Sequence, residues 1–433
     1  MRAAGSPLVR GGLTLAVGVL TGNVLGFARV ATIAYLLGTH SRADSLAVAT
    51  GPVDTLNSAL FNGLVFAFVP MLSALGGAER AALFRKLSGC FWAVLAALGA
   101  VLIAFAEPLM RALAPGLDPA YFPLAVRLLR IALLATPASG ALAVHCALLY
   151  TNRRFGPAAY YQATINFTTV AVALALWKAV GVYGFAIGYT AGTWIQLGVA
   201  WFAARPMLRN AAAAHCNMAW NEMLARPAFF MVYAAGLGLN MIFTRAWVTQ
   251  LGPGMAAAFD YCMRGVSVPL AILVTPISNS LLPEIARLRS LGRIRDALRL
   301  VDRTVALTSL VVVGAAGFAL AFRTPAIRVI FQRGSFTAEC RALVSAVFLG
   351  LGASLVGWCL IEIFSRSLFA MERPWPPVIA AAVPVLVNAA VTLHFSPRQP
   401  EWIGVGPSVG LLAGFVALFA TAHAGRRRWA RQA

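Results

Sequence analysis

The sequence predicts an all-α polytopic membrane protein, with about twelve transmembrane helices in two parallel six-helix lobes around a central cavity. Three observations support this fold class: the composition, the number of long apolar stretches and an internal repeat. Apolar residues make up 60% of the 433 residues and charged residues 11%, and the mean hydropathy is +0.79. A soluble globular domain carries roughly 25% charged residues. We therefore expect the chain to be embedded in a membrane.

The number of helices follows from the apolar stretches. A bilayer core about 30 Å thick is crossed by a helix of roughly 20 apolar residues. Twelve stretches meet this requirement, with approximate cores at residues 12–37, 46–74, 88–113, 123–149, 158–179, 182–203, 228–251, 257–283, 304–322, 342–370, 376–395 and 403–424.

The distribution of basic residues predicts the orientation. A formal net charge of +21 would ordinarily suggest a nucleic-acid partner. Most of the 35 lysines and arginines, however, lie in short connecting segments that alternate along the chain. This is the positive-inside distribution, which places both termini in the cytoplasm and fits an even number of spans. No nucleic-acid partner is expected, because no folded soluble domain presents these charges as a stripe.

An internal repeat divides the spans into two halves. With Pro70 set against Pro283, FAFVPMLSALGGAERAALFRKL aligns with NSLLPEIARLRSLGRIRDALRL, and we expect a helix to end at each of these prolines. Upstream, FARVATIAYLLG resembles FTRAWVTQLG, so that Arg29 corresponds to Arg245. Halves of equal orientation indicate parallel repeats, and the substrate site is expected between them.

The repeat also sets the expected domain boundaries. Residues 1–204 are predicted to form the N-terminal six-helix lobe and residues 227–425 the C-terminal one. The amphipathic segment 205–226 is predicted to link them at the cytoplasmic surface. Residues 426–433 are predicted to be a basic cytoplasmic tail.

Several ionisable residues fall within or at the edges of the apolar stretches. Such groups cost a few kcal/mol each at membrane depth and are kept mainly where they line a water-filled cavity or a substrate path. They therefore predict a transporter. The candidates are three arginines for substrate binding, and four acidic residues for gating or charge pairing: Arg29, Arg245 and Arg264; Asp44, Asp54, Asp260 and Glu362.

Each candidate also has a structural interpretation, which the sequence leaves open. Arg29 is near the end of its span, where an arginine can snorkel to the surface. The spacing of Asp260 and Arg264, four residues apart, suits an ion pair along one helix. Asp44 could cap the second helix.

Asp54 follows Pro52 inside the membrane and is expected either to pair with an arginine or to carry a proton. Glu362 precedes Arg366 by four residues, which favours an ion pair within the helix.

No cofactor, metal centre or enzyme activity is expected. The cysteines and histidines are scattered and form no metal-ligand pattern. Asn240 and Asn388 could offer oxygens to Na⁺, but no carboxylate accompanies them. The coupling of transport to membrane potential, protons or Na⁺ stays open. An intramembrane enzyme would normally present paired carboxylates or histidines on a sizeable loop, and a nucleotide-binding GxxxxGK[ST] loop is missing from the sequence.

Several motifs carry a resemblance to a known family. They are NVLGFARVATIAYLLGTHSRADSLAVATGPVDTLNSALFNGLVFAFVPML, LLYTNRRFGPAAYYQATINF, MRGVSVPLAILVTPISNSLLPEIAR and VIFQRGSFTA. Together they resemble the MurJ (MviN) lipid II flippase family of the MOP flippase superfamily, which also includes MATE exporters. The resemblance covers nearly the whole chain.

The resemblance implies a flippase of the bacterial inner membrane. Its substrate would be an undecaprenyl-pyrophosphate-linked saccharide, moved from the cytoplasmic to the periplasmic leaflet by alternating access for peptidoglycan synthesis. Membrane lipids and cell-envelope biosynthesis proteins are the implied partners. The family's arginines in the first and eighth spans correspond to Arg29 and Arg264, and its acidic residue before the second span to Asp44. Arginine suits this substrate because its planar guanidinium binds phosphate oxygens bidentately.

The chain departs from the family pattern at three places. Gly22-Asn23 stands where the family usually has Ser-Arg, and the neutral stretch Leu56-Asn57-Ser58 stands where it typically has arginine. The family also commonly has two further helices that form a groove for the lipid tail. Two alternatives to a lipid II flippase therefore stay open: a flippase for another lipid-linked oligosaccharide, such as an exopolysaccharide or O-antigen unit, and a non-transporting scaffold derived from a flippase.

Overall fold

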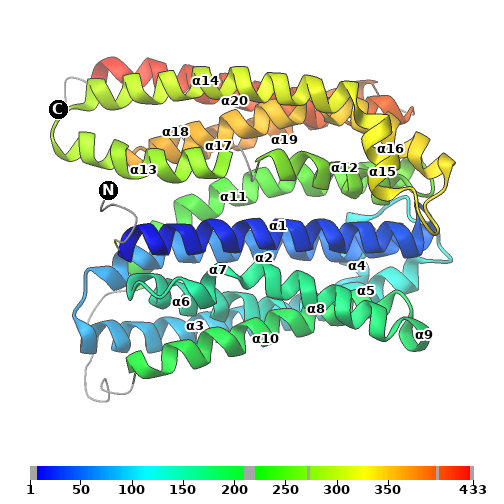
Figure 1. The fold of residues 1–433 in the computed structure, drawn as a ribbon, viewed down its shortest axis with the longest axis horizontal. Coiled ribbons are helices and arrows are strands. Elements are labelled where there is room, and N and C mark those ends of the chain that lie inside the picture. The colour runs from blue at the N-terminus through cyan, green and yellow to red at the C-terminus, as the bar shows by residue number, and fades with distance from the viewer. Residues whose placement is uncertain (1–6, 209–219, 271–273, 396–398, 430–433) are drawn as a thin grey trace. The chain divides into compact units, whose positions relative to one another are not determined.

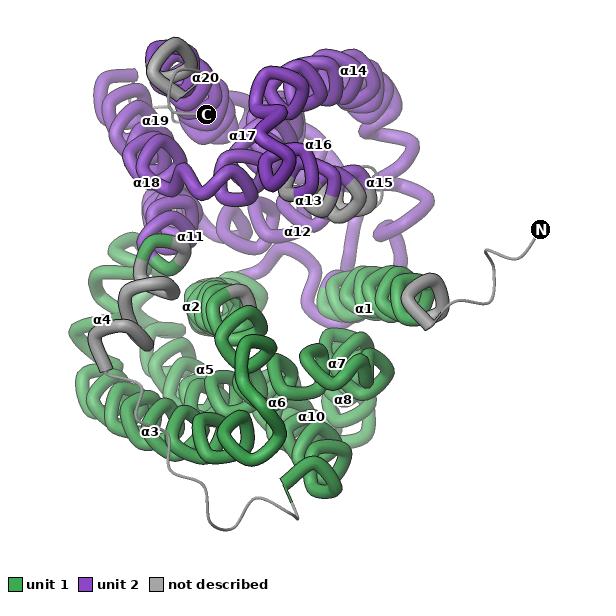
Figure 2. Tube along the Cα trace, turned by 90° about the vertical axis from the view of Figure 1, so that its left-hand side faces the viewer, with its two compact units in different colours: residues 1–33, 41–231 green, residues 34–40, 232–433 purple. Residues whose placement is uncertain are grey.

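The computed structural model describes residues 7–208, 220–270, 274–395 and 399–429, and its regular structure in these ranges is helical (Figure 1). The predicted all-α fold is thereby confirmed. The chain divides into two compact units, which Figure 2 distinguishes by colour. Unit 1 comprises residues 1–33 and 41–231, and unit 2 comprises residues 34–40 and 232–433. The described ends of the predicted linker 205–226 lie in helices, while residues 209–219 are outside the described ranges.

Unit 1 contains most of the first ten α-helices and the beginning of the eleventh. Their bounds are α1 (Pro7–Leu37), α2 (Ser41–Ser73), α3 (Gly77–Ala104), α4 (Ala106–Leu113), α5 (Phe122–Leu133), α6 (Thr136–Thr151), α7 (Gly156–Ala159), α8 (Tyr161–Ala175), α9 (Trp177–Val180), α10 (Tyr183–Leu208) and α11 (Trp220–Val248).

Unit 2 contains most of α11 and the helices that follow it. Their bounds are η2 (Thr249–Leu251), α12 (Met255–Pro269), α13 (Thr275–Ser290), α14 (Ile294–Ala321), α15 (Arg323–Phe331), α16 (Ala338–Leu351), α17 (Ser354–Ala370), α18 (Trp375–Ala380), α19 (Ala382–Phe395), η4 (Pro400–Trp402) and α20 (Val405–Trp429).

The described residues include seven helical stretches that are long and apolar enough to cross a membrane. The number is eight if α16 and α17, which are bent by 47° relative to each other, form one span. Two further predicted spans contain a short helix break but still count as single stretches: residues 123–149 divide into α5 and α6, and residues 376–395 into α18 and α19. The number of twelve spans stays a prediction.

The expected helix ends at the repeated prolines are wrong. Pro70 lies inside α2, which continues to Ser73, and Pro283 lies inside α13, which continues to Ser290. Proline removes one backbone hydrogen bond, but its φ angle is compatible with a helix. Neighbouring helices make such prolines tolerable in membrane proteins.

Glycines line the contact between α8 and α10 in unit 1. Gly184, Gly188 and Gly192 recur every four residues on α10 and face the backbone of α8. A Cβ atom at Gly188 would lie 2.7 Å from the Cα of Thr169, so only glycine fits there. This is the small-residue packing that lets membrane helices approach closely.

Unit 2 repeats the same pattern on α20. Gly406, Gly410 and Gly414 are offset by 222 residues from the three glycines of α10 and face α19. A Cβ atom at Gly410 would lie 2.5 Å from the carbonyl oxygen of Pro384. The sequence repeat therefore corresponds to a repeated helix pair within each unit.

The C-terminal end of α1 belongs to unit 2. Gly38 ends the helix with a φ angle of +59°, and its carbonyl oxygen accepts a hydrogen bond from the Tyr261 hydroxyl at 2.6 Å. The amide of Ser335 donates to the carbonyl oxygen of Tyr35 at 2.8 Å. A left-handed φ at this position favours glycine, because other residues would be strained.

Candidate substrate-binding site

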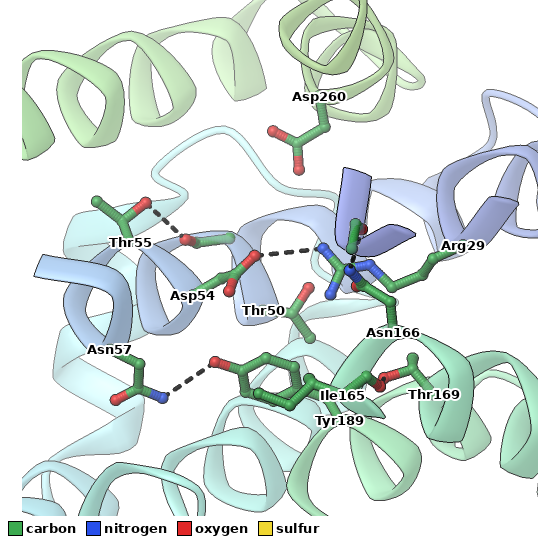
Figure 3. A network of polar contacts seen from close by, with 12 residues as sticks. Arg29, Thr50, Asp54, Thr55, Asn57, Ile165, Asn166, Thr169, Tyr189 and Asp260 are labelled. Carbon is green, nitrogen blue, oxygen red and sulfur yellow. Dashed lines mark hydrogen bonds and ion pairs between the residues drawn. The ribbon is translucent and has the colours of Figure 1, made fainter. Parts of the chain in front are cut away.

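Arg29 and Asp54 form an ion pair between α1 and α2 in unit 1. The Arg29 Nη2 atom donates to Asp54 Oδ2 at 3.2 Å, as the dashed line in Figure 3 shows. The side chains are 21% and 44% exposed, respectively. The contact corresponds to one of the two roles that the sequence left open for Asp54, and its role in transport stays a prediction. Both charges remain partly accessible, as a ligand-exchanging site requires.

Small residues bring α1 against α7 and α8, two to three turns before Arg29. A Cβ atom at Gly18 would lie 2.5 Å from the carbonyl oxygen of Ala159. The side-chain amide of Asn166 donates to the carbonyl oxygen of Gly22 at 3.1 Å. This buried polar contact fixes the segment of α1 that carries Arg29, because a misplaced α1 would leave the Asn166 amide unsatisfied.

Two further polar residues surround Asp54. The Asn57 amide donates to the Tyr189 hydroxyl at 3.1 Å, and both residues are at most 5% exposed. The Tyr189 side chain lies beside Asp54 (Figure 3). Asn57 occupies the neutral stretch where the related family typically has arginine. In this chain, that position places a buried side-chain amide near Asp54.

Arg245 forms the corresponding pair in unit 2. It lies one turn before the end of α11, and Asp260 lies in the second turn of α12, so the helical hairpin places them opposite each other. The Arg245 Nε and Nη2 atoms donate to Asp260 Oδ1 at 3.0 and 2.7 Å. The Arg245 side chain is 9% exposed, and its guanidinium lies 5.9 Å from the ring centroid of Phe259.

Arg264 and Asp44, the other two residues predicted from the family resemblance, differ in burial. Arg264 is one turn after Asp260 on α12 and is partly buried. Asp44 is in the first turn of α2 and is 4% exposed. A carboxylate in the first turn is stabilised by the positive end of the helix dipole. Their predicted functional roles stay predictions.

Glu362 and Arg366 form the expected ion pair along α17. The Arg366 Nη2 atom lies 2.5 Å from Glu362 Oε1, with the side chains 33% and 20% exposed for the arginine and the glutamate. The structural interpretation of this pair is confirmed. A gating role for Glu362 stays a prediction.

Asn240 and Asn388 are brought together inside unit 2. The Asn388 amide donates to Asn240 Oδ1 and to Thr244 Oγ1, both at 2.8 Å, and Asn388 Oδ1 accepts from Thr392 at 3.1 Å. The two asparagines are fully buried. Both amide oxygens are thus used by neighbouring donors. Within the described ranges, no group of three or more histidine, cysteine or acidic residues is arranged to hold a metal ion.

The sequence contained two signals that would have located more of this site. The GxxxGxxxG runs at Gly184 and Gly406 mark the helix pairs that support the polar residues in each unit. The same offset of 222 residues relates Asn166 to Asn388, which are buried on α8 and α19. Tyr189 had no such signal, because its role depends on a contact across 132 residues of sequence.

Comparison with known proteins shows a consistent family. The model of the lipid II flippase MurJ family matches residues 33–429. A probable lipid II flippase MurJ of Rhizobium meliloti (strain 1021) is 27% identical over 438 residues, which cover 96% of this chain and 80% of the relative.

Solved structures show the same fold. A lipid II flippase MurJ in an inward closed conformation aligns with a TM-score of 0.82 at 18% identity, covering 95% of this chain and 87% of the other. An inward-facing MATE family multidrug transporter of the MOP superfamily aligns with a TM-score of 0.78 at 12% identity, covering 95% and 98%. The predicted MOP/MATE-like fold class is confirmed.

Proposed function

The chain belongs to the lipid II flippase MurJ family, and from this membership we propose that it is a lipid II flippase. In this proposal it moves an undecaprenyl-pyrophosphate-linked saccharide from the cytoplasmic to the periplasmic leaflet by alternating access. It is a membrane transporter and not an enzyme, as the family and the apolar helices indicate. The positive-inside distribution supports placing both termini in the cytoplasm of a bacterium.

The observation that carries the proposal is the partial exposure of Arg29 on an apolar helix. Its guanidinium lies on an apolar helix, is partly exposed and donates to Asp54 at 3.2 Å. An arginine has five N–H donors and stays charged at any physiological pH, so it can bind a phosphate oxygen pair bidentately. Arg264 on α12 is the second proposed phosphate contact, because it matches the family's arginine in the eighth span.

A second candidate function is the transport of a different lipid-linked oligosaccharide. The Asn57 amide donates to the Tyr189 hydroxyl at a place where the family typically carries arginine. One positive charge that could bind the head group is therefore replaced by a neutral side chain. A head group with fewer negative charges is more complementary to a site with fewer positive charges. The polyprenyl pyrophosphate would be common to both substrates.

Complementation tests the proposal. A strain depleted of its own lipid II flippase should grow when it expresses the wild-type chain and should fail to grow with Arg29→Ala or Arg264→Ala. Arg111→Ala is the matched control, because Arg111 is 70% exposed and pairs with Glu107 along its own helix. Membrane abundance of each variant is measured in parallel.

The outcomes separate the substrate from the mechanism. If the wild-type chain reaches the membrane but does not restore growth, lipid II is not its substrate. If both alanine variants restore growth as well as Arg111→Ala does, the arginines do not bind the head group.

A further inference from the structure

Arg29 and Arg245 occupy corresponding positions in the sequence repeat, and each pairs with an aspartate of the following helix. The two pairs nevertheless differ in accessibility. The Arg245 guanidinium is 9% exposed and directs two donors to one carboxylate oxygen of Asp260. This buried, charge-assisted arrangement favours a permanent contact.

The Arg29 pair is more accessible to solvent, with the arginine and aspartate side chains 21% and 44% exposed against 9% and 25% in the Arg245 pair. A single donor reaches Asp54 at 3.2 Å, which is at the long end of the hydrogen-bond range. The Asp54 side chain is 44% exposed, so water and ligands reach the carboxylate. Ion pairs of this kind contribute little net stability, because solvent screens them. The contact can therefore open at low cost.

Asp54 also has a second partner once the pair opens. Tyr189 is buried beside Asp54, and its hydroxyl oxygen accepts a hydrogen bond from the Asn57 amide. The hydroxyl hydrogen is therefore available for the carboxylate. Figure 3 shows these side chains together in unit 1. The Tyr189 hydroxyl can therefore donate a hydrogen bond to the Asp54 carboxylate after the carboxylate has left Arg29.

From this contrast we propose that the Asp54 carboxylate occupies the anion site of Arg29 when no substrate is bound, and that a substrate phosphate displaces it. The proposal rests on the proposed function, because the displacing group is the pyrophosphate of the lipid-linked saccharide. Asp54 thereby acts as a release residue: it competes with the substrate phosphate for Arg29, and its return to Arg29 assists departure of the product.

A double-mutant cycle tests the exchange. Purified wild-type protein, Asp54→Asn, Arg29→Ala and the double variant are titrated with undecaprenyl pyrophosphate in detergent, and bound lipid is measured by native mass spectrometry. We expect Asp54→Asn to lower the Kd by about two- to fivefold, the scale of a partly exposed ion pair. The same substitution in the Arg29→Ala background should leave the Kd unchanged.

Two controls exclude indirect effects. Glu107→Gln removes the same formal charge from an exposed pair and should leave the Kd unchanged. Asp54→Ser also removes the carboxylate, and it replaces Asp54→Asn if the asparagine variant does not elute as a monodisperse peak.

Each outcome decides between the proposals. If Asp54→Asn binds the lipid as wild-type does or more weakly, or gains affinity equally without Arg29, the exchange is overturned while the proposed function stands. If the wild-type protein does not bind undecaprenyl pyrophosphate, the proposed function and the exchange are both overturned.

Discussion

Two aspartate–arginine pairs occur at related places in the chain, and solvent access separates their roles. Desolvation makes a buried ion pair costly to break, because removing one partner leaves an uncompensated charge. An exposed pair is screened and contributes little. The arginine side chains are 9% exposed in Arg245 and 21% in Arg29, and the aspartate side chains are 25% exposed in Asp260 and 44% in Asp54. The same two residue types can therefore stabilise one unit and remain exchangeable in the other.

This difference predicts the effect of two matched substitutions on stability. Asp260→Asn should lower the free energy of unfolding by about 3 kcal/mol, because buried Arg245 loses its carboxylate. Asp54→Asn should lower it by less than about 1 kcal/mol, because solvent replaces the partner of Arg29. The midpoints of thermal unfolding in detergent check this order. Equal midpoints for the two variants would show that burial does not distinguish the pairs.

The sequence identified which charged residues are of interest better than it identified which of them contact each other. The position of Asp54 in an apolar stretch left two roles open, pairing with an arginine or carrying a proton, and the structure shows Arg29 as its partner. For Asp260, the spacing favoured Arg264 on the same helix, whereas the structure shows an ion pair with Arg245. Only the spacing of Asp260 and Arg264 is a helical one, because Arg245 lies on the preceding helix. The hairpin between α11 and α12 determines the contact with Arg245, and a period within one helix does not reveal a hairpin.

At the scale of elements, glycine spacing determines how closely the paired helices approach. The α10 glycines pack on α8, and the α20 glycines pack on α19. Lipid tails are as apolar as leucine, so helices associate in membranes through close packing rather than through exclusion from water. The repeated glycines therefore provide the contact surfaces that hold each helix pair together.

Alanine substitutions in α10 test this packing. A Cβ atom at Gly188 would lie 2.7 Å from the Cα of Thr169, whereas nothing lies within 4 Å of a Cβ atom at Gly198 on the same helix. Gly188→Ala should therefore destabilise unit 1 by about 1 to 3 kcal/mol through overpacking. Gly198→Ala should be neutral or stabilising by up to about 1 kcal/mol, because alanine has the higher helix propensity.

Thermal unfolding midpoints and the yield of monodisperse protein provide the measurement. A loss of the same size in both variants would contradict the packing argument, because propensity and general sensitivity of α10 would then explain the effect. Gly410→Ala in α20, with Gly317→Ala in α14 as its control, repeats the comparison in unit 2.

Helix boundaries were predicted less well than the existence of helices. Hydropathy reports which residues avoid water, but a helix break inside an apolar stretch leaves the hydropathy unchanged. The bend between α16 and α17 at Gly352 is an example. Conversely, Pro70 was expected to end a helix but lies inside α2, because membrane packing compensates for the lost hydrogen bond.

At the scale of the whole molecule, the fold class followed from composition and repetition, and the family followed from short motifs. Both are confirmed, by the helical structure and by the family match over residues 33–429. The number of spans was less accessible to sequence reasoning. It depends on how bent helix pairs sit in the bilayer, which hydropathy does not describe.

The energy source of transport can be predicted from the charge of the proposed substrate. A pyrophosphate head group carries about two negative charges, and each charge that crosses the membrane gains or loses about 2.3 kcal/mol per 100 mV. Outward movement from an interior at negative potential is therefore favourable. We predict that the membrane potential drives the flippase.

Proteoliposomes that contain lipid II test this prediction, with the potential set by a potassium gradient and valinomycin. The protein inserts in both orientations, and the readout is the accessibility of the lipid II head group from outside. Movement of the head group away from the negative side should be faster than movement towards it, by severalfold at 100 mV, and collapse of the potential should equalise the two rates. The Arg29→Ala variant should show slow movement in both directions. If the rates ignore the potential and instead follow an imposed Na⁺ or proton gradient, ion coupling replaces the electrical mechanism.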